Sequence, residues 1–588
     1  MPHAVVSLVQ AMPLRPKKVS GFPTRTLFRL VLSGCLSLGG AWSVAIRPGF
    51  SAEQMTVRVG DRPVMVPLSE VERFAKTGQV NPALALITQT LDNSSRQQLR
   101  QALITPILPL KAADVDRLTG TTLFEPLMKT LGKALQSTSS NPGNLPMRTA
   151  LKRAAASSYG LSLLGILRGY PEQTVQVNLI YLLQLMTQLS VLSQYRDAAV
   201  KAVEQADQTE PAAMTLPPVA RLPRVQNAGS YAVQERSLKF KIVKPRLPQT
   251  GAGSSYLLPV DLYLPKNAPQ PAPLIVFSHG FGARSDAYAY LAKHLASHGF
   301  AVAAVEHLGS DLDYRQVFLA GKLSDLILPQ EMINRSRDIT YLLDELEKQV
   351  ALGGTLAGAI EVTRVGVLGN SLGATTALSV AGAPLNLQRL RADCNDDRIT
   401  LSMSFLVQCV TKTASTQAFV NLGDRRIKAV FAAYPLTSHI FGPESLSQIT
   451  VPTFIMGGSN DIVAPVVQDQ IHPFLWLKTP EKYLALIVPG THFSTSEDAH
   501  VRSFPTALVG PGLSTGRSYL QTMSTAFFKR HLTNAPDYQP LLTAAYAASI
   551  RQANLQIYLT RSLTATQLEQ AYGSTPPTPI VPKPVAAK

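Results

Sequence analysis

One stretch of the sequence could supply a nucleophilic serine. Residues 365–374 read VGVLGNSLGA, an apolar run followed by Ser371, with a glycine two positions before the serine and another two positions after it. This pattern predicts a strand, a tight turn with the serine at its apex, and the start of a helix. The turn would expose the serine oxygen at the carboxyl end of the strand, where it could attack a carbonyl carbon.

The same glycine spacing occurs again around Ser514, at residues 512–516. No apolar strand pattern precedes this second serine, and it lies beyond every plausible partner histidine but one. We therefore interpret Ser514 as a loop residue. The glycine spacing alone is a weak signal, and the strand pattern before Ser371 is what makes Ser371 the candidate nucleophile.

A serine nucleophile needs a base, because its free hydroxyl is almost fully protonated at neutral pH. Enzymes with this serine turn carry their partners in the order serine, acid, histidine. The histidines that follow the serine are His439, His472, His492, His500 and His531. We predict His492 as the base, because it directly follows the apolar run at 483–488 and would lie at the sheet edge where Ser371 projects. His472 falls in a helical pattern, and His531 lies near the end of a terminal helix.

An acid must hold the imidazole in the right tautomer and stabilise the imidazolium that forms during catalysis. Asp461 ends the segment that begins with the strand pattern at residue 453, and the next strand pattern is the one before His492. Both loops would therefore open on the same edge of the sheet. A capping or turn aspartate would also fit this local sequence, and Glu444 and Asp469 are the alternative acids. We predict Asp461, because the strand one earlier offers no carboxylate before Glu444.

Backbone N–H groups that stabilise a tetrahedral oxyanion are visible in a sequence only through the turns that expose them. The sequence SHGFG at residues 278–282 follows an apolar strand pattern and predicts such a turn. We expect one donor from Phe281, with Gly282 as the alternative, and the other from Leu372, the residue after the nucleophile. His279 is expected to be a structural member of this loop and not a second base.

Short apolar runs alternate with helical patterns through the second half of the chain. The runs lie at residues 274–277, 301–305, 365–368, 429–433, 453–456 and 483–488. Continuous apolar strands separated by helices indicate an α/β protein with a mostly parallel sheet and helices on both faces. Such a sheet brings the loops after its strands to one edge, and with them the candidate serine, acid and histidine.

The sequence outside the candidate site predicts a helical N-terminal domain, a linker and the bounds of the catalytic domain. Residues 53–207 open with a short hairpin pattern and are then mostly helical, with one long helical pattern over about 172–206. Residues 208–230 contain several prolines and are expected to form an extended linker. The catalytic domain is expected at 231–535, followed at 536–588 by a helical segment and a disordered tail rich in Pro and Ala.

An insert between strand patterns, at about residues 385–426, holds Cys394 and Cys409. In an oxidising compartment two cysteines this close are expected to pair, which closes a loop of roughly 15 residues and stabilises the fold by about 3 kcal/mol. The alternative is two buried free thiols, and no histidine lies at metal-ligand spacing from either cysteine. The apolar run at 403–407 could line an acyl pocket or form the small core of a folded cap.

In the first 52 residues, charged, apolar and small residues follow one another in the order that is typical of an export signal. Basic residues up to Arg29 precede an uncharged run at 30–46, and small residues follow up to Ala52. We expect a signal peptide, with an uncleaved membrane anchor as the alternative, and export to the periplasm, the thylakoid lumen or the cell exterior. A lipoprotein-like box ends at Cys35, but too little apolar chain separates this cysteine from Arg29.

The composition is that of a globular protein, with 45% apolar and 16% charged residues. Lys and Arg number 55 against 38 Asp and Glu, and these charges are scattered along the chain. No basic stripe interleaved with aromatic residues occurs, so nucleic-acid binding is not expected. The positive charge leaves association with an anionic membrane surface open.

The candidate site resembles that of a known group of enzymes. The loop at residues 278–282, the run at 303–307 and the serine turn at 369–373 are similar to those of the platelet-activating-factor acetylhydrolases, a branch of the α/β-hydrolases. The acid departs from that pattern, because Asp461 lies one strand later, as in dienelactone hydrolase-like enzymes. The resemblance covers roughly residues 231–535 and implies an α/β-hydrolase fold.

Residues 53–207 separately resemble the helical domain of unknown function that precedes such hydrolases in cyanobacterial proteins. Residues and resemblance together indicate a serine carboxylic ester hydrolase that works through an acyl-enzyme on a small or lipid-like ester, without a metal or organic cofactor. One rival is a serine peptidase of the prolyl-oligopeptidase kind, but its β-propeller would need a region of repeated strands where this chain is helical. Another is a non-catalytic binding protein with the same fold, which would lack a member of the triad.

Overall fold

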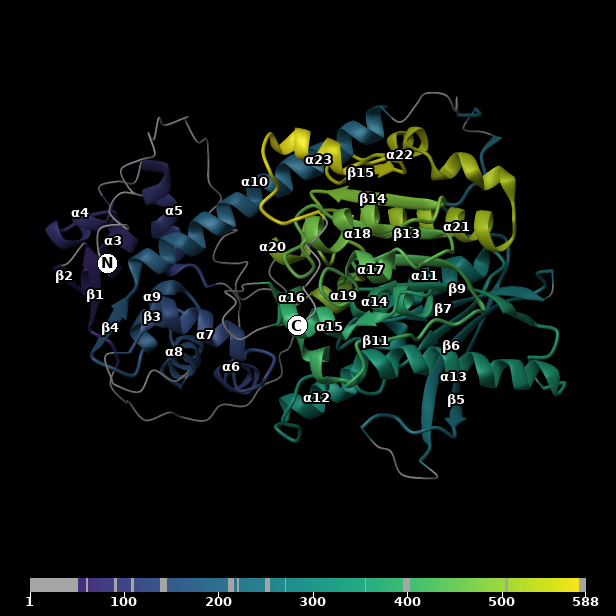
Figure 1. Ribbon diagram of the computed structural model, residues 1–588, viewed down its shortest axis with the longest axis horizontal. Helices are drawn as coiled ribbons and strands as arrows, with labels where there is room; N and C mark the ends of the chain where they lie inside the picture. Colours follow the sequence, from purple (N-terminus) through teal and green to yellow (C-terminus); the bar gives the residue numbers. More distant parts are fainter. Residues whose placement is uncertain are drawn as a thin grey trace.

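The computed structural model describes residues 51–580, apart from gaps at residues 60–61, 89–92, 107–109, 138–144, 210–215, 219–220, 249–253, 270, 355, 395–401 and 503–505. The expected export segment at residues 1–52 therefore lies almost entirely outside the described residues. Figure 1 shows a smaller N-terminal part in purple and blue beside a larger part built around one sheet. The larger part holds the candidate catalytic residues.

Within the described residues the larger part contains a nine-stranded sheet in the order β15-β14-β13-β12-β9-β7-β8-β6-β5. Its strands are β5 (Val233–Ile242), β6 (Tyr256–Pro265), β7 (Ala272–Ser278), β8 (Ala301–Val305), β9 (Ile360–Asn370), β12 (Ile427–Ala433), β13 (Thr453–Gly458), β14 (Lys482–Val488) and β15 (Gln556–Thr560). The six strands from β14 to β8 in this order pair in parallel with their neighbours. The outer pairs β14–β15, β8–β6 and β6–β5 are antiparallel. All six apolar runs of the sequence are strands of the parallel part.

Helices cover both faces of this sheet. The four that pack on its centre are α11 (Ala289–Ser297), α13 (Glu331–Ala351), α14 (Leu372–Val380) and α21 (Leu513–Leu532). Leu274 and Val276 of β7 share one buried cluster with α13 and α14. Ile275 and Phe277, which point to the other face, share a second cluster with α11 and α21. Burial on both faces explains why these strands read as unbroken apolar runs.

Shorter elements lie at the strand ends, in the insert and after residue 535. They are α12 (Leu312–Leu319), β10 (Leu385–Asn386), α15 (Leu387–Asp393), α16 (Met403–Val410), β11 (Phe419–Val420), α17 (Gly442–Leu446), α18 (His472–Trp476), α19 (Asp498–Val501), α20 (Thr506–Val509), α22 (Ala544–Ile550) and α23 (Ala565–Tyr572). No helix in the described part of the chain is both long and apolar enough to cross a membrane.

The N-terminal part combines seven short helices with a small sheet of order β2-β1-β4-β3 in the residues that the structure describes. Its strands are β1 (Gln54–Val59), β2 (Arg62–Pro67), β3 (Leu135–Gln136) and β4 (Thr174–Val177), and its helices are α3 (Leu68–Thr77), α4 (Pro82–Thr88), α5 (Asn93–Ile104), α6 (Ala112–Thr119), α7 (Glu125–Ala134), α8 (Leu145–Ala156) and α9 (Leu163–Gly169). The long helix expected over 172–206 starts later, as α10 (Leu179–Thr209). Its predicted first residues form β4 instead, because they pair in parallel with β1.

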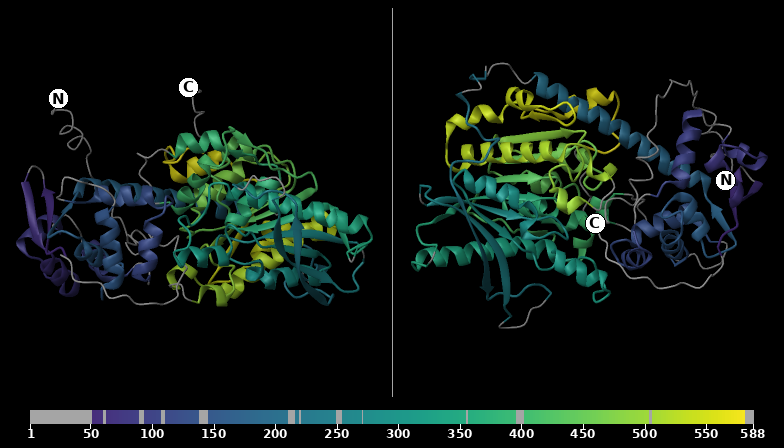
Figure 2. Two further views of the ribbon diagram at one scale, coloured as in Figure 1. Left: turned by 90° about the horizontal axis from the view of Figure 1, so that it is seen from below. Right: turned by 180° about the vertical axis from the view of Figure 1, so that it is seen from behind.

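Helix α10 runs from the N-terminal part to the catalytic part, as Figure 1 and the right-hand view of Figure 2 show. The hydroxyl of its Tyr195 lies 2.9 Å from Nε2 of His472 in α18. Near its end, Asp207 accepts hydrogen bonds from Arg551 and from the backbone N–H of Leu559 in β15, each at 2.8 Å. The helix is therefore anchored at the β15 edge of the large sheet.

Two expected boundaries differ in the structure. In the expected linker, Val225 is 1% exposed and its carbonyl oxygen lies 3.0 Å from Nε2 of His294, so this segment packs on α11. The sheet also extends past residue 535, because β15 pairs with β14. Part of the expected disordered tail is packed as well, since Ile580 is 7% exposed and its carbonyl accepts the indole N–H of Trp476.

Candidate active site

Ser371 occupies the apex of a sharp turn between β9 and α14. Its φ of 57° lies in the left-handed region, which costs a non-glycine residue on the order of 1–3 kcal/mol. The backbone N–H of Ser371 donates to the carbonyl oxygen of Ala433 at 2.8 Å, so the neighbouring strand holds the turn. A Cβ at Gly369 would lie 2.1 Å from the carbonyl oxygen of Gly373, which explains why the strand and helix need glycine to approach this closely.

The structure brings together the three residues predicted as nucleophile, base and acid. Nε2 of His492 lies 2.9 Å from Oγ of Ser371, and Nδ1 of His492 lies 2.7 Å from Oδ2 of Asp461. A carboxylate can only accept, so Nδ1 carries the ring hydrogen and the Nε2 lone pair faces the serine hydroxyl. His492 and Asp461 are each 6% exposed.

The positions of Asp461 and His492 follow from two adjacent parallel strands. β13 and β14 end side by side, and a Cβ at Gly458 would lie 2.6 Å from the carbonyl oxygen of Gly490 in the His492 loop. The second carboxylate oxygen of Asp461 accepts the backbone N–H groups of Val463 and Ala464, each at 2.8 Å. This oxygen is therefore fixed by its own loop, while the first remains directed at the imidazole.

The alternative residues lie in other surroundings. Glu444 lies 3.6 Å from Nη1 of Arg389. Asp469 accepts the backbone N–H groups of Thr437 and Ser438 at 2.8 and 3.0 Å, and burial raises its pKa. Ser514 is not in a loop, as interpreted from the sequence, but is an exposed residue in the first turn of α21. Asp461 is therefore the acid that contacts His492.

A single hydrogen bond distinguishes between Phe281 and Gly282, the two candidates for the first oxyanion donor. The N–H of Gly282 donates to the carbonyl oxygen of Ser310 at 2.7 Å, so it is already used. The N–H groups of Phe281 and Leu372 have no partner among the described residues. The loop also touches the nucleophile, because a Cβ at Gly280 would lie 3.4 Å from Cβ of Ser371. Phe281 and Leu372 are thus the available donors beside the serine.

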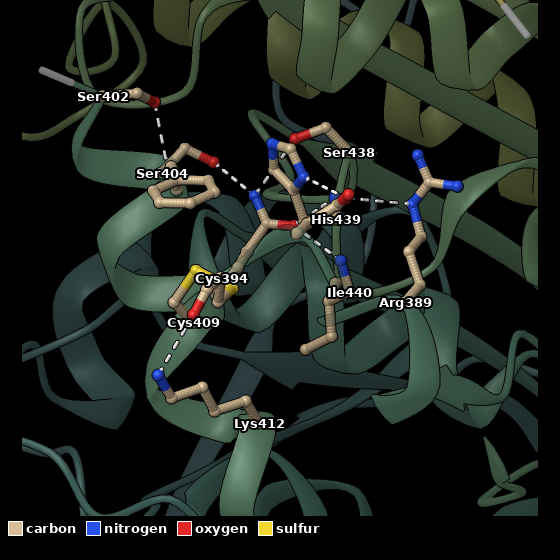
Figure 3. The surroundings of a disulfide bond; sticks show 12 residues. Arg389, Cys394, Ser402, Ser404, Cys409, Lys412, Ser438, His439 and Ile440 are labelled. Atoms are coloured by element: carbon tan, nitrogen blue, oxygen red, sulfur yellow. Dashed lines mark hydrogen bonds and ion pairs between the residues drawn. A yellow bond between two sulfur atoms is a disulfide. The ribbon is translucent and has the colours of Figure 1, made fainter. Parts of the chain in front are cut away.

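The insert is linked by a disulfide between Cys394 and Cys409. Figure 3 shows this bond beside Lys412, whose Nζ donates to the carbonyl oxygen of Cys394 at 3.1 Å. Next to Cys409 in α16, the side-chain oxygen of Gln408 accepts the backbone N–H of His439 at 2.8 Å. The disulfide and the Lys412 contact brace the insert internally, and the Gln408 contact joins it to the loop after β12.

Of the two expectations for the apolar run at 403–407, the structure favours packing within a folded insert, although the run joins the main core and does not form a small core of its own. Met403, Phe405 and Leu406 are 1%, 5% and 2% exposed and belong to the main hydrophobic core of the described chain. Side chains this deeply packed hold the insert in place and present little surface to a substrate.

Tyr434 is a neighbour of the candidate base His492 that the sequence analysis did not select. It follows the last residue of β12, and its ring packs edge-on against His492 with centroids 5.6 Å apart. The available signal was its position directly after a strand, at the same sheet edge as Ser371 and Asp461. Among the described residues, no group of three or more His, Cys, Asp and Glu side chains is arranged to hold a metal ion.

Two families match separate segments of the chain. Residues 51–178 match the family described as "Alpha/beta hydrolase of unknown function (DUF1400)". Residues 233–312 match "Platelet-activating factor acetylhydrolase, isoform II", a segment that includes the loop at 278–282 and ends before Ser371.

A curated relative is similar to this chain over a shorter segment. The platelet-activating factor acetylhydrolase of Cavia porcellus is 47% identical over 53 residues. That segment is 9% of this chain and 12% of the relative, so most of either protein lies outside the match. The sheet, its covering helices and these matches agree: the chain has an α/β-hydrolase fold and resembles the esterases of that group, platelet-activating factor acetylhydrolase among them.

Proposed function

We propose that this protein is a serine carboxylic ester hydrolase that works through an acyl-enzyme. Ser371 is the nucleophile, His492 the general base and Asp461 the residue that orients the imidazole. The observation that carries the proposal is the hydrogen-bonded chain from Asp461 Oδ2 through both ring nitrogens of His492 to Ser371 Oγ, at 2.7 and 2.9 Å. The two unused N–H groups beside the serine, those of Phe281 and Leu372, supply the oxyanion hole.

In acylation, Oγ of Ser371 forms a bond to the ester carbonyl carbon while its proton passes to Nε2 of His492. Asp461 stabilises the imidazolium that results. The carbonyl oxygen becomes an oxyanion held by the N–H groups of Phe281 and Leu372. The tetrahedral intermediate then collapses, the bond to the alcohol oxygen breaks, and His492 returns its proton to that oxygen.

In deacylation, a water oxygen forms a bond to the acyl carbon and gives its proton to Nε2 of His492. The second tetrahedral intermediate uses the same two N–H donors. When it collapses, the bond between the acyl carbon and Oγ breaks, and Oγ recovers the proton from His492. The carboxylic acid leaves and the enzyme returns to its starting state.

A small or lipid-like ester is the proposed substrate class. The family matched by residues 233–312 is named for the hydrolysis of an acetyl group, which supports a short acyl chain. The apolar side chains of the insert, Met403, Phe405 and Leu406, are packed in the core, and this burial also favours a short acyl group.

We further propose that the protein is exported. The disulfide between Cys394 and Cys409 supports an oxidising compartment, because such bonds are rare in the reducing cytosol. The order of charge, apolar run and small residues in the first 52 positions supports the same placement.

A series of p-nitrophenyl esters, from acetyl to dodecanoyl, tests the proposal. We expect an initial burst of nitrophenolate equal in amount to the enzyme, followed by slower turnover, with the highest kcat/KM for short acyl chains. Mass spectrometry of the enzyme quenched during the burst should find the acyl group on Ser371. Cleavage of peptides with no ester hydrolysis at any chain length would favour the peptidase instead, and an inert protein would favour a binding role.

A further inference from the structure

A second serine–histidine–aspartate chain lies directly beneath the oxyanion loop. Oγ of Ser278 is 2.9 Å from Nε2 of His307, and Nδ1 of His307 is 3.0 Å from Oδ2 of Asp338. These distances resemble those of the candidate catalytic chain, but the three residues come from the end of β7, the loop after β8, and α13. None of the three is more than 1% exposed.

This buried chain is not arranged for nucleophilic attack. Nη2 of Arg335, itself 0% exposed, donates to Oγ of Ser278 at 3.2 Å. The serine oxygen therefore already accepts a hydrogen bond, while its O–H is directed at His307. Substrate could reach Ser278 only if the core opened. A buried, hydrogen-bonded polar network of this kind supports what is packed on it.

Charges within the network compensate one another. Two guanidiniums, of Arg335 and Arg246, lie among two carboxylates, of Glu331 and Asp338. Nη2 of Arg246 is 3.0 Å from Oε1 of Glu331, and its Nη1 is 3.4 Å from Oδ2 of Asp338. Burial lowers the pKa of His307 well below its usual value, and both guanidiniums act in the same direction. His307 is therefore neutral, donating to the carboxylate and accepting from the serine hydroxyl.

The network holds the oxyanion loop at two points. Nη2 of Arg335 also donates to the carbonyl oxygen of His279. The backbone N–H of His307 donates to Nε2 of the His279 ring at 3.0 Å. From the side of the nucleophile, α14 closes on the same loop, because a Cβ at Gly373 would lie 2.0 Å from the carbonyl oxygen of Ser278.

The contact to the His279 ring decides which of its nitrogens carries the hydrogen. Nε2 accepts the His307 N–H, so Nε2 is unprotonated and the hydrogen of the neutral ring lies on Nδ1. Burial lowers the pKa of His279 well below its usual value, with Arg335 and His307 acting in the same direction, which keeps the ring neutral. Its Nδ1–H then donates to the carbonyl oxygen of Gly280 at 2.7 Å.

The Gly280 carbonyl belongs to the same peptide group as the N–H of Phe281. That group is planar and trans, so its N–H points opposite to its C=O. A side chain that fixes the direction of the carbonyl therefore also fixes the direction of the N–H. The N–H of Ala283 donates to the same Gly280 oxygen at 3.3 Å, which adds a second restraint.

We propose that His279 is a positioning residue that aims the Phe281 N–H at the oxyanion. The backbone N–H of His307 holds it in the required tautomer, and the buried Ser278–His307–Asp338 side chains anchor His307 in turn. The inference rests on the proposed serine hydrolase function. His279 acts through the backbone of its loop and contacts neither the substrate nor the reacting atoms.

The variants His279→Ala and His279→Gln test this proposal. We expect His279→Ala to lower kcat per titrated active site by roughly 10- to 100-fold with KM little changed, because an oxyanion donor acts mainly in the transition state. Inhibition by a boronic acid, whose tetrahedral serine adduct imitates the intermediate, should weaken by a similar factor. His279→Gln retains one acceptor and one donor near the ring's position and should recover part of the loss.

His294→Ala is the matched control, because His294 is 5% exposed and its ring binds a backbone carbonyl outside the oxyanion loop. It should keep kcat per titrated site even if its melting temperature falls. Unchanged kcat and boronate affinity in His279→Ala would overturn the proposal. If that variant does not fold, His279→Gln decides: a loss in both values supports the proposal, and wild-type values overturn it. Failure of a fluorophosphonate to titrate Ser371 in the unmodified protein would count against the proposed function instead.

Discussion

The phenol ring of Tyr434 lies edge-on against the imidazole of His492, with the ring planes at 62° and the centroids 5.6 Å apart. Tyr434 is fully buried and has a φ of 53°, so the chain turns sharply at the end of β12 and places the ring behind the base. The imidazole is thus held by Asp461 at one nitrogen and by an aromatic contact on its side. Contacts of this kind limit the motion of the imidazole, which in the proposed mechanism takes up and returns a proton twice per turnover.

Tyr434→Ala should therefore lower kcat by roughly 10-fold and destabilise the fold by about 3–5 kcal/mol, as expected for the loss of a buried aromatic ring. Tyr434→Phe should stay near wild type, because burial raises the pKa of Tyr434 well above its usual value and the phenol carries no charge to lose. Ester kinetics and urea unfolding measure the two effects. Equal damage from both variants would show that the hydroxyl, and not the ring contact, matters.

Ser371→Ala should reduce ester hydrolysis by several orders of magnitude while leaving the fold intact. Its matched control is Ser514→Ala, which alters the same glycine-flanked motif at an exposed helix turn and should keep full activity. Circular dichroism checks the fold, and labelling with a fluorophosphonate probe checks the nucleophile. A probe that still labels the Ser371→Ala protein at another serine, with activity retained, would refute the assignment.

Asp461→Asn should impair kcat severely, because an amide can donate to Nδ1 and so favour the wrong tautomer of His492. The loss can approach 10⁴-fold, on the order seen for the same change in other triads. Glu444→Gln is the control and should have little effect, since Glu444 lies near Arg389. A large loss from Glu444→Gln with Asp461→Asn unaffected would move the acid one strand earlier.

Reduction of the bond between Cys394 and Cys409 should loosen the insert before it unfolds the sheet. The bond closes a loop with a sequence separation of 15, worth about 3 kcal/mol by loop entropy. We expect KM or chain-length preference to change at reductant concentrations that leave the unfolding of the sheet unaltered. Peptide mapping without reductant provides the control: two free thiols in exported protein would contradict the prediction and weaken the proposal of export.

Stability should fall as the pH drops below about 6.5, because buried histidines resist protonation in the folded state. Burial lowers the pKa of His472 from 6.5 to about 4, and the same cause brings His294 and His531 to about 4. The unfolded chain therefore takes up protons first, so the free energy of unfolding is largest above pH 6.5. It decreases between pH 6.5 and 4, by up to about 1.4 kcal/mol per pH unit for each histidine.

Urea unfolding at a series of pH values measures this dependence. His472→Gln removes one titrating ring from the contact with Tyr195 and should make the pH dependence shallower. An identical slope in the variant would mean that His472 does not titrate differently in the two states.

Local patterns predicted the centre of the catalytic sheet but not its edges. All six apolar runs became parallel strands because burial on both faces leaves an unbroken apolar stretch that can be read directly. β5 and β6 lie at one antiparallel edge and β15 at the other, beyond the expected end of the domain. β4 was misread as the start of a helix, since only its pairing with a strand more than a hundred residues earlier makes it extended.

The candidate site also has features that local patterns predict and others that depend on contacts between distant segments. The turn around Ser371 could be predicted because its glycines allow the strand and the helix to approach closely, which is a local requirement. Asp461 and His492 could be predicted because each directly follows a strand. Which of Phe281 and Gly282 has a free N–H for the oxyanion could not be predicted, since it depends on a hydrogen bond from Gly282 to a carbonyl in another loop.

By itself, the sequence determined which residues could be nucleophile, base and acid, because side-chain chemistry, turn geometry and strand order are local properties of the chain. Only the tertiary structure decided that Ser371 and His492, 121 positions apart, lie 2.9 Å from each other. The same holds for the fully buried His279 and the network beneath it. Distances of this kind depend on how strands from distant segments pair and on what fills the space between them, and no local pattern encodes either.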